Sequence, residues 1–177
     1  RSVVASKRDD GSASIDVGFD LGGDGATADV RYDVAYLMAR DGSAQVTARF
    51  YPRYVGLPDP LRVGLAFTMP SRFVDLAWYG RGPHETYADR DSSGEIALYA
   101  GKIAEQHHDY IRPQETGNKV GVRWLRLAPE QGAALTVSGS TPLSVNALAF
   151  PYSDLERRPV GSAHSSDIRA HGRDRKS

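Results

Sequence analysis

Apolar residues alternate with polar ones along most of this chain, and this period of two constrains the fold more than any other feature. Ile15, Val17 and Phe19 are separated by polar or small residues, and a longer ladder of the same kind runs from Val30 to Met38. Such alternation places every second side chain on the same face of a strand. No segment keeps the apolar stripe of an amphipathic helix for three turns. The pattern therefore predicts half-buried β-strands and no long helix.

The same alternation recurs downstream, and the segments between the runs are typical of tight turns. Further predicted strands cover 46–50, 63–69, 74–79, 96–103, 120–127, 134–137 and 143–148. Asp10-Gly11 and Asp41-Gly42 lie between runs, where Asp and Gly favour hairpin turns. About ten short strands separated by turns favour a sandwich or a barrel. A short helical turn is expected only near 153–157.

Length and composition exclude several classes of protein. The chain has 177 residues, enough for one domain with its own core. Its 22 basic and 22 acidic residues cancel, which argues against nucleic-acid and anionic-membrane partners. No apolar run approaches the ~20 residues of a membrane-spanning helix, and the absence of cysteine leaves the compartment open. The start, Arg1-Ser2-Val3-Val4, lacks an initiator Met and a signal-peptide layout, so we expect a piece of a longer polypeptide.

Signatures of catalytic chemistry are scarce in this sequence. It has neither a Gly-x-Ser-x-Gly elbow nor a P-loop. Ser162, His164 and Asp167 are of triad type, but they stand close together in a polar tail, whereas triads usually join distant segments. His107 and His108 are adjacent, so on a strand they would face opposite sides and could not share a metal ion. We therefore expect no catalytic residue, no metal site and no cofactor in this segment.

Two stretches depart from the alternation and are dense in Arg, Glu, Gly, Pro and aromatic residues. They read WYGRGPHETYADR, residues 78–90, and YIRPQETGNK, residues 110–119. Such composition is typical of loops with a fixed shape. Glu85 and Glu115 lie close in sequence to Arg81 and Arg112, and a guanidinium stabilises the carboxylate anion, which handicaps a general acid. We therefore favour an ion-pair network over a catalytic pair of carboxylates.

The same stretches also carry the residue types that hold sugars. Aromatic rings stack on the C–H face of a sugar, while Arg, Glu and Asn bind its hydroxyls. The candidate carbohydrate-binding residues are Tyr79, Arg81, His84, Glu85, Tyr87, Arg112, Glu115 and Asn118. A core role is the alternative for the aromatic rings, and we favour it for Trp78 and Trp124, which lie within strand patterns.

Several groups of residues carry a resemblance to a known family. They are Pro60 to Leu65, Met69-Pro70 with Phe73, WYGRGPHETYADR, RPQETGN, Phe150 to Ser153, Asp154-Leu155 and His164. Over residues 3 to 168 the sequence resembles the small-chain, C-terminal domain of β-galactosidases of glycoside hydrolase family two. The resemblance implies an all-β antiparallel supersandwich like that of galactose mutarotase. It also implies one domain over 1–168, truncated at both ends, with 169–177 as a disordered polar tail.

The resemblance further implies an accessory role in a retaining β-galactosidase, which hydrolyses terminal β-D-galactosyl residues. The domain would contribute to carbohydrate binding, cleft shape and assembly. In the family the catalytic glutamates belong to a central barrel that nothing here resembles, so the segment alone is expected to be inactive. The implied partners are the catalytic barrel portion of the parent enzyme and galactosides, with homo-oligomerisation through an unpaired edge strand as an option. A stand-alone carbohydrate-binding module and an aldose-1-epimerase-like enzyme remain alternatives.

Overall fold

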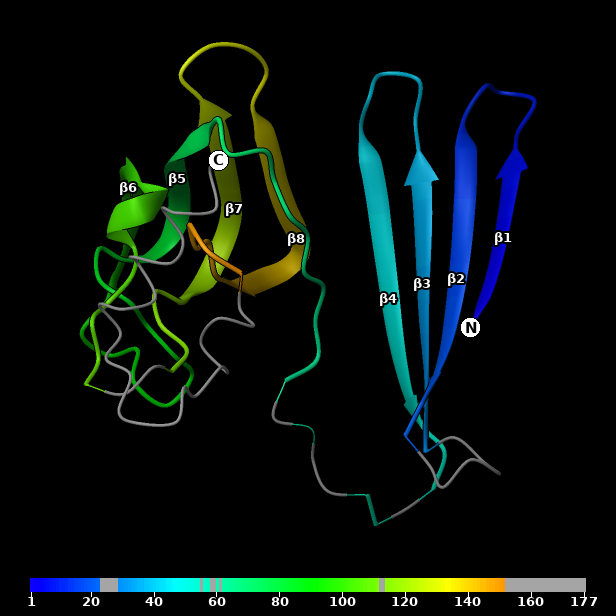
Figure 1. Ribbon diagram of the computed structural model, residues 1–177, viewed down its shortest axis with the longest axis horizontal. Coiled ribbons are helices and arrows are strands. Elements are labelled where there is room, and N and C mark those ends of the chain that lie inside the picture. Colours follow the sequence, from blue (N-terminus) through cyan, green and yellow to red (C-terminus); the bar gives the residue numbers. More distant parts are fainter. Residues whose placement is uncertain (23–28, 55, 58–59, 61, 112–113, 152–177) are drawn as a thin grey trace, which may run out of the picture. The chain divides into compact units, whose positions relative to one another are not determined.

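The chain folds almost entirely into β-strands. The computed structural model describes residues 1–22, 29–54, 56–57, 60, 62–111 and 114–151. The chain divides into two compact units, Arg1–Phe67 and Thr68–Ser177, each built on one four-stranded antiparallel sheet (Figure 1). Among the described residues no helix has the length and apolar character needed to cross a membrane. The all-β prediction is confirmed, and the single domain over 1–168 stays a prediction; the turn near 153–157 and the tail lie outside the described residues.

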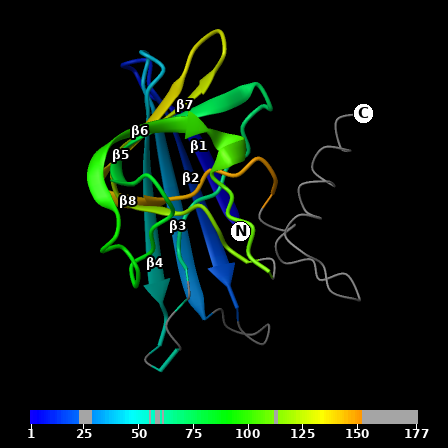
Figure 2. The same cartoon turned by 90° about the vertical axis from the view of Figure 1, so that its left-hand side faces the viewer.

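The first sheet contains four strands in sequence order. They are β1 (Ser2–Lys7), β2 (Ala13–Leu21), β3 (Val30–Met38) and β4 (Ala44–Pro52). They lie side by side in both views (Figure 1, Figure 2). As predicted, Asp-Gly turns join β1 to β2 and β3 to β4, with positive φ at Gly11 and Gly42. β1 was not predicted, because Val3 and Val4 are adjacent and apolar residues do not alternate with polar ones along this strand.

The two faces of the first sheet differ in polarity. The register places Val3, Val17, Val34 and Ala48 in one row across the four strands, and Val34 is buried. On the opposite face Arg31 pairs with Asp20 and Asp33, at N–O distances of 3.2 Å and 2.7 Å. The alternation read in the sequence thus separates an apolar face from a polar one.

The second sheet carries the buried core of its unit. Its strands are β5 (Phe73–Gly82), β6 (Glu95–Lys102), β7 (Lys119–Pro129) and β8 (Leu135–Val145), in the spatial order β6-β5-β7-β8. The 3-10 turn η1 (Ile103–Glu105) follows β6. The core cluster comprises Leu76, Trp78, Val122, Leu125 and Leu127. The core role predicted for Trp78 is confirmed, whereas that for Trp124 is wrong, because Trp124 is half-buried and lies outside this cluster.

Two strand predictions differ from the structure. Residues 63–69 alternate but form no strand; apart from half-buried Met69 they are exposed, and alternation without a partner strand makes no ladder. The predicted strands 134–137 and 143–148 correspond largely to the single strand β8. Its register against β7 breaks, since Trp124 pairs with Ser138 and Val122 pairs with Leu143. The described residues therefore hold eight strands rather than about ten.

Candidate functional site

The two unusual stretches of sequence meet beside the second sheet. The loop after β5 brings in Thr86, and the segment before β7 brings in Asn118, both nearly inaccessible to solvent. Thr86 N–H donates to the Asn118 carbonyl at 2.8 Å, and Asn118 Nδ2 donates to the Thr86 carbonyl at 2.9 Å. Val120 N–H donates to Thr86 Oγ1 at 3.0 Å. These bonds fasten the two loops together, and we call the arrangement the loop clamp.

Glu85 is the centre of the loop clamp, with a side chain only 12% exposed. Its Oε1 accepts from Arg90 Nη2 at 2.8 Å and from the Tyr110 hydroxyl. Its Oε2 accepts from the Gly117 N–H at 2.7 Å and from Thr116 Oγ1 at 3.3 Å. Both oxygens of this carboxylate are therefore occupied by donors from its own unit.

The electrostatics of the loop clamp keep Glu85 ionised. Burial raises the pKa of this carboxyl, but the hydrogen bonds from Tyr110 and Gly117 and the charge of Arg90 outweigh burial and lower the pKa overall. A general acid must carry a proton at working pH, so a carboxylate held in this way is poorly suited to that role. The arrangement instead suits a structural anion.

Arg90 links the aromatic rings of the loop clamp. Its guanidinium lies 4.7 Å from the ring centroid of Tyr87 and 5.8 Å from that of Tyr110, and its Nη2 donates to the Tyr110 hydroxyl at 2.7 Å. Tyr87 is half-buried, and burial together with the charges of Glu85 and Glu115 raises the pKa of its hydroxyl. The Tyr87 ring thus packs against the Arg90 guanidinium within the protein.

Two residues beneath the loop clamp were not among the predicted site residues. Lys119 is 3% exposed; its Nζ donates to the Gly117 carbonyl at 3.1 Å and lies 5.2 Å from the Trp78 ring centroid. Burial lowers the pKa of Lys119 to about 8, although the negative charge of Glu85 raises it in part. Gly117 has φ +76°, and a Cβ there would lie 2.4 Å from the Gln106 carbonyl oxygen, so only glycine fits. The sequence signal for Lys119 was its place at the end of the unusual stretch 110–119, directly before the predicted strand 120–127.

Arg81 does not pair with Glu85, contrary to the expectation from their proximity in sequence. Its Nε contacts Asp91 Oδ2 at 3.1 Å, and its Nη1 donates to the Gly94 carbonyl at 2.7 Å. Arg81 therefore shapes the loop between β5 and β6, while Arg90 is the ion-pair partner of Glu85.

The other predicted site residues do not converge on one site. His84 Nε2 lies 2.8 Å from Ser93 Oγ and is exposed. Glu115 is half-buried, and Tyr79 is 40% exposed on β5. Arg112 lies outside the described residues. Within the described ranges no three His, Asp or Glu side chains are placed to hold a metal ion.

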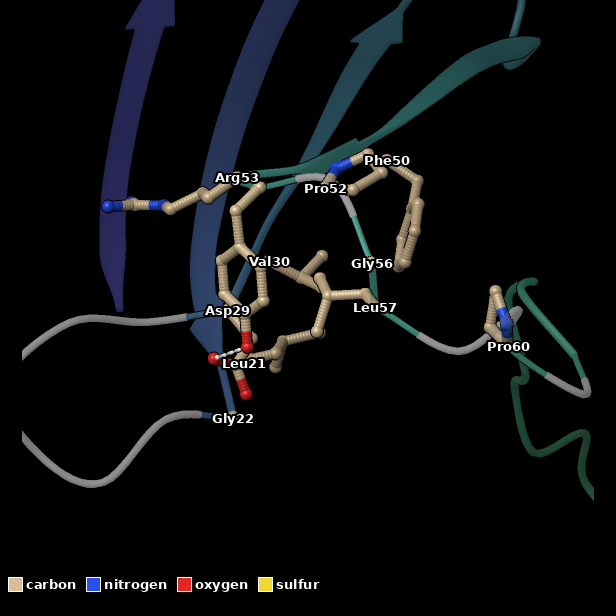
Figure 3. Close-up of a pocket in the computed structure, with 11 residues that line it drawn as sticks. Leu21, Gly22, Asp29, Val30, Phe50, Pro52, Arg53, Gly56, Leu57 and Pro60 are labelled. Carbon is tan, nitrogen blue, oxygen red and sulfur yellow. Dashed lines mark hydrogen bonds between the residues drawn. The ribbon is translucent and has the colours of Figure 1, made fainter.

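A separate hollow of about 610 Å³ lies at one end of the first sheet. Its apolar lining residues include Leu21, Val30, Phe50 and Leu57. Figure 3 shows Leu21, Val30 and Leu57 close together, with Arg53 extending away from them. The Tyr54 hydroxyl donates to Asp29 Oδ1 at 2.9 Å, and Arg53 pairs with Asp20. The polar groups of the hollow are thus engaged within the protein, and none of the predicted site residues lines it.

The sequence matches the family described as beta galactosidase small chain over residues 3–175. The chain belongs to this family. The family predicted from the two loop stretches is therefore confirmed, and the match includes the whole loop clamp.

Relatives of this small-chain segment are much longer proteins named beta-galactosidase. That of Priestia megaterium (strain DSM 319 / IMG 1521) is 40% identical over 123 residues, which are 70% of this chain and 12% of the relative. That of Halalkalibacterium halodurans is 30% identical over 129 residues, or 72% of this chain and 13% of the relative. That of Lactobacillus delbrueckii subsp. bulgaricus is 34% identical over 93 residues, 52% of this chain and 9% of the relative. The small-chain segment thus spans about an eighth of the first two relatives.

Proposed function

We propose that this chain is a non-catalytic accessory segment of a retaining β-galactosidase, and that hydrolysis belongs to a catalytic barrel elsewhere in the parent polypeptide. The observation that carries the proposal is the state of Glu85, whose two oxygens accept from four donors of its own unit. The names and greater lengths of the relatives support the parent enzyme and its galactoside substrates.

Three acids of the second unit are arranged as ion-pair partners rather than as a catalytic pair. A retaining glycosidase needs two carboxyls about 5 Å apart, one as nucleophile and the other protonated to act as acid. Glu85 is held as an anion by Arg90. Asp75 pairs with Lys102 at 2.6 Å. Asp91 pairs with Arg81. Each of these three acids is paired with a cation, an arrangement that suits a structural role rather than the reaction.

The first sheet supports a role in assembly. Its apolar face continues across all four strands, yet Val3 and Val46 on this face are 55% and 43% exposed. An apolar sheet face of this extent normally packs against a further layer of structure. We infer that residues 1–168 act as one small-chain domain, with the polar residues 169–177 as its tail.

Hydrolysis by the purified 177-residue chain tests the proposal directly. We expect no release of nitrophenol from a nitrophenyl β-galactoside above the buffer rate, for the chain itself and for Glu85→Gln and Glu115→Gln. Turnover that either substitution abolishes would overturn the accessory role. Polarimetry on freshly dissolved α-galactose tests the epimerase alternative: we expect the uncatalysed rate, and an acceleration would favour that alternative.

A further inference from the structure

Tyr79 and Trp124 lie side by side on the face of the second sheet that is opposite its core. They are register partners on β5 and β7, whereas the next register pair, Trp78 and Leu125, belongs to the core cluster. Because neighbouring residues of a strand point to opposite faces, Tyr79 and Trp124 share the other face, which we call the outer face. Tyr79 is 40% exposed and Trp124 is half-buried, so this pair is accessible from one side.

A break in strand register brings a guanidinium to this aromatic pair. The register of β7 against β8 shifts between Val122 and Trp124, and Arg123 stands at the shift. Its guanidinium carbon lies 5.6 Å from the Tyr79 ring centroid, and its Nη1 donates to the Gly121 carbonyl at 2.6 Å. Bulged registers commonly redirect a side chain in this way. Arg123 thus lies over the ring of Tyr79, the register partner of Trp124.

The backbone next to the aromatic pair is closely packed, which holds its two strands together. A Cβ at Gly80 would lie 2.8 Å from the Val122 Cα, so β5 and β7 approach each other in a way that only glycine permits at this point. The rings therefore project from strands with a fixed separation, so binding would not require the backbone to be ordered first.

Polar groups of the aromatic pair remain available for a ligand. Within the described residues, the Tyr79 hydroxyl makes no hydrogen bond, and Arg123 makes no ion pair with a carboxylate. A guanidinium has five N–H donors, so the bond to Gly121 leaves others free. An exposed ring beside unused donors combines an apolar surface with hydrogen-bonding groups at its edge.

We propose that Tyr79, Trp124 and Arg123 form a shallow binding site for a pyranose sugar on the outer face of the second sheet. The apolar C–H face of the sugar ring lies on Tyr79 and Trp124, and Arg123 with the Tyr79 hydroxyl binds ring hydroxyls. The choice of a galactoside as ligand rests on the proposed function. This site differs from the loop clamp, whose Glu85 and Asn118 are occupied by bonds within the protein. An open face that contacts only one side of a small sugar predicts a dissociation constant of about millimolar.

Titration of the 15N-labelled chain with methyl β-galactoside and lactose, followed by NMR, tests the site. We expect saturable shifts at residues 79, 98, 123 and 124, because Leu98 is the register partner of Tyr79 on β6. Tyr79→Ala should abolish the shifts, and Arg123→Ala should weaken binding about tenfold. Tyr79→Phe should retain binding within a few fold, since stacking persists. The matched control is Tyr51→Ala, which removes a similarly exposed tyrosine of the first sheet and should leave binding unchanged.

Three results would overturn the proposed sugar site. The first is the absence of saturable shifts in the wild-type chain, and the second is a Tyr79→Ala variant that is folded by circular dichroism and still binds. The third is sedimentation that shows self-association lost in Tyr79→Ala, without sugar-induced shifts, which would make the outer face a contact between copies of the chain. A failure of sugar binding leaves the accessory role standing, because the hydrolysis assay tests that role separately.

Discussion

Replacing Glu85 by alanine tests the loop clamp as the source of stability in the second unit. The substitution leaves the Gly117 N–H and the Thr116 hydroxyl without their carboxylate and removes the partner of Arg90. Removing one partner of a buried ionic network costs about 3–5 kcal/mol. Arg90 is 54% exposed and can regain water, which places the expected loss at the lower end, about 3 kcal/mol. At roughly 2–4 °C per kcal/mol for a chain of this size, Tm should fall by about 6–12 °C.

Urea unfolding followed by tryptophan fluorescence measures this loss. Both tryptophans of the chain, Trp78 and Trp124, belong to the second unit, so the signal reports on that unit. Glu95→Ala is the matched control, because Glu95 is exposed on β6 and makes no ion pair within the described residues. It should change the free energy of unfolding by less than about 0.5 kcal/mol. Equal urea midpoints for Glu85→Ala and Glu95→Ala would refute the clamp reasoning.

The pH dependence of the free energy of unfolding provides a second test of the role of Glu85. The pKa of Glu85 is lower in the folded chain than in the unfolded one, so the unfolded state takes up its proton first as pH falls. The stabilisation by Glu85 is therefore complete above the unfolded pKa of about 4.3 and is lost as pH falls through the folded pKa. The difference between wild type and Glu85→Ala should be full at pH 7 and should shrink below about pH 4. A difference that stays constant down to pH 3 would contradict the charge-based account.

Two further predictions concern residues beneath the loop clamp. Lys119 has a folded pKa of about 8, below the usual ~10.4, so the unfolded state binds more protons between these values and stability should rise with pH there. Lys119→Met should flatten this rise between pH 7.5 and 9.5 in urea unfolding, and an unchanged slope would contradict the assignment. Gly117→Ala should destabilise the chain by about 1–3 kcal/mol more than Gly132→Ala, because both glycines have positive φ but only Gly117 faces a backbone oxygen at 2.4 Å. An equal fall in Tm for the two variants would contradict the proposed clash at Gly117.

Local sequence patterns predicted most strands because alternation is itself a local property. The ladder from Val30 to Met38 coincides with β3, and the Asp-Gly pairs mark the turns that precede β2 and β4. The pattern misled at 63–69, since a strand also requires a neighbour that offers hydrogen bonds. It missed β1 because pairing with β2, rather than alternation, makes that segment a strand.

The loop clamp was only partly predictable from the sequence. The density of Glu and Arg indicated an ion-pair network, and the structure contains one at Glu85. The choice of partner depends on how the loop turns back, which proximity in sequence does not show: Arg90 is five residues away and Tyr110 is 25. The role of Gly117 requires a contact across 32 residues with Glu85. Such long-range contacts have no local signature in one sequence.

The strand order β6-β5-β7-β8 places β5 beside β7, although the whole excursion from residue 83 to residue 118 separates them in the chain. That excursion contains β6, which pairs with the other edge of β5, and Thr86 and Asn118 join its two ends near β5 and β7. Ile111, which is 83% exposed, directly follows Tyr110, whose hydroxyl donates to Glu85 in the loop clamp. Changes in length near Ile111 would therefore disturb the contact of Tyr110 with Glu85 before they reach the strand pairing at the root of the loop.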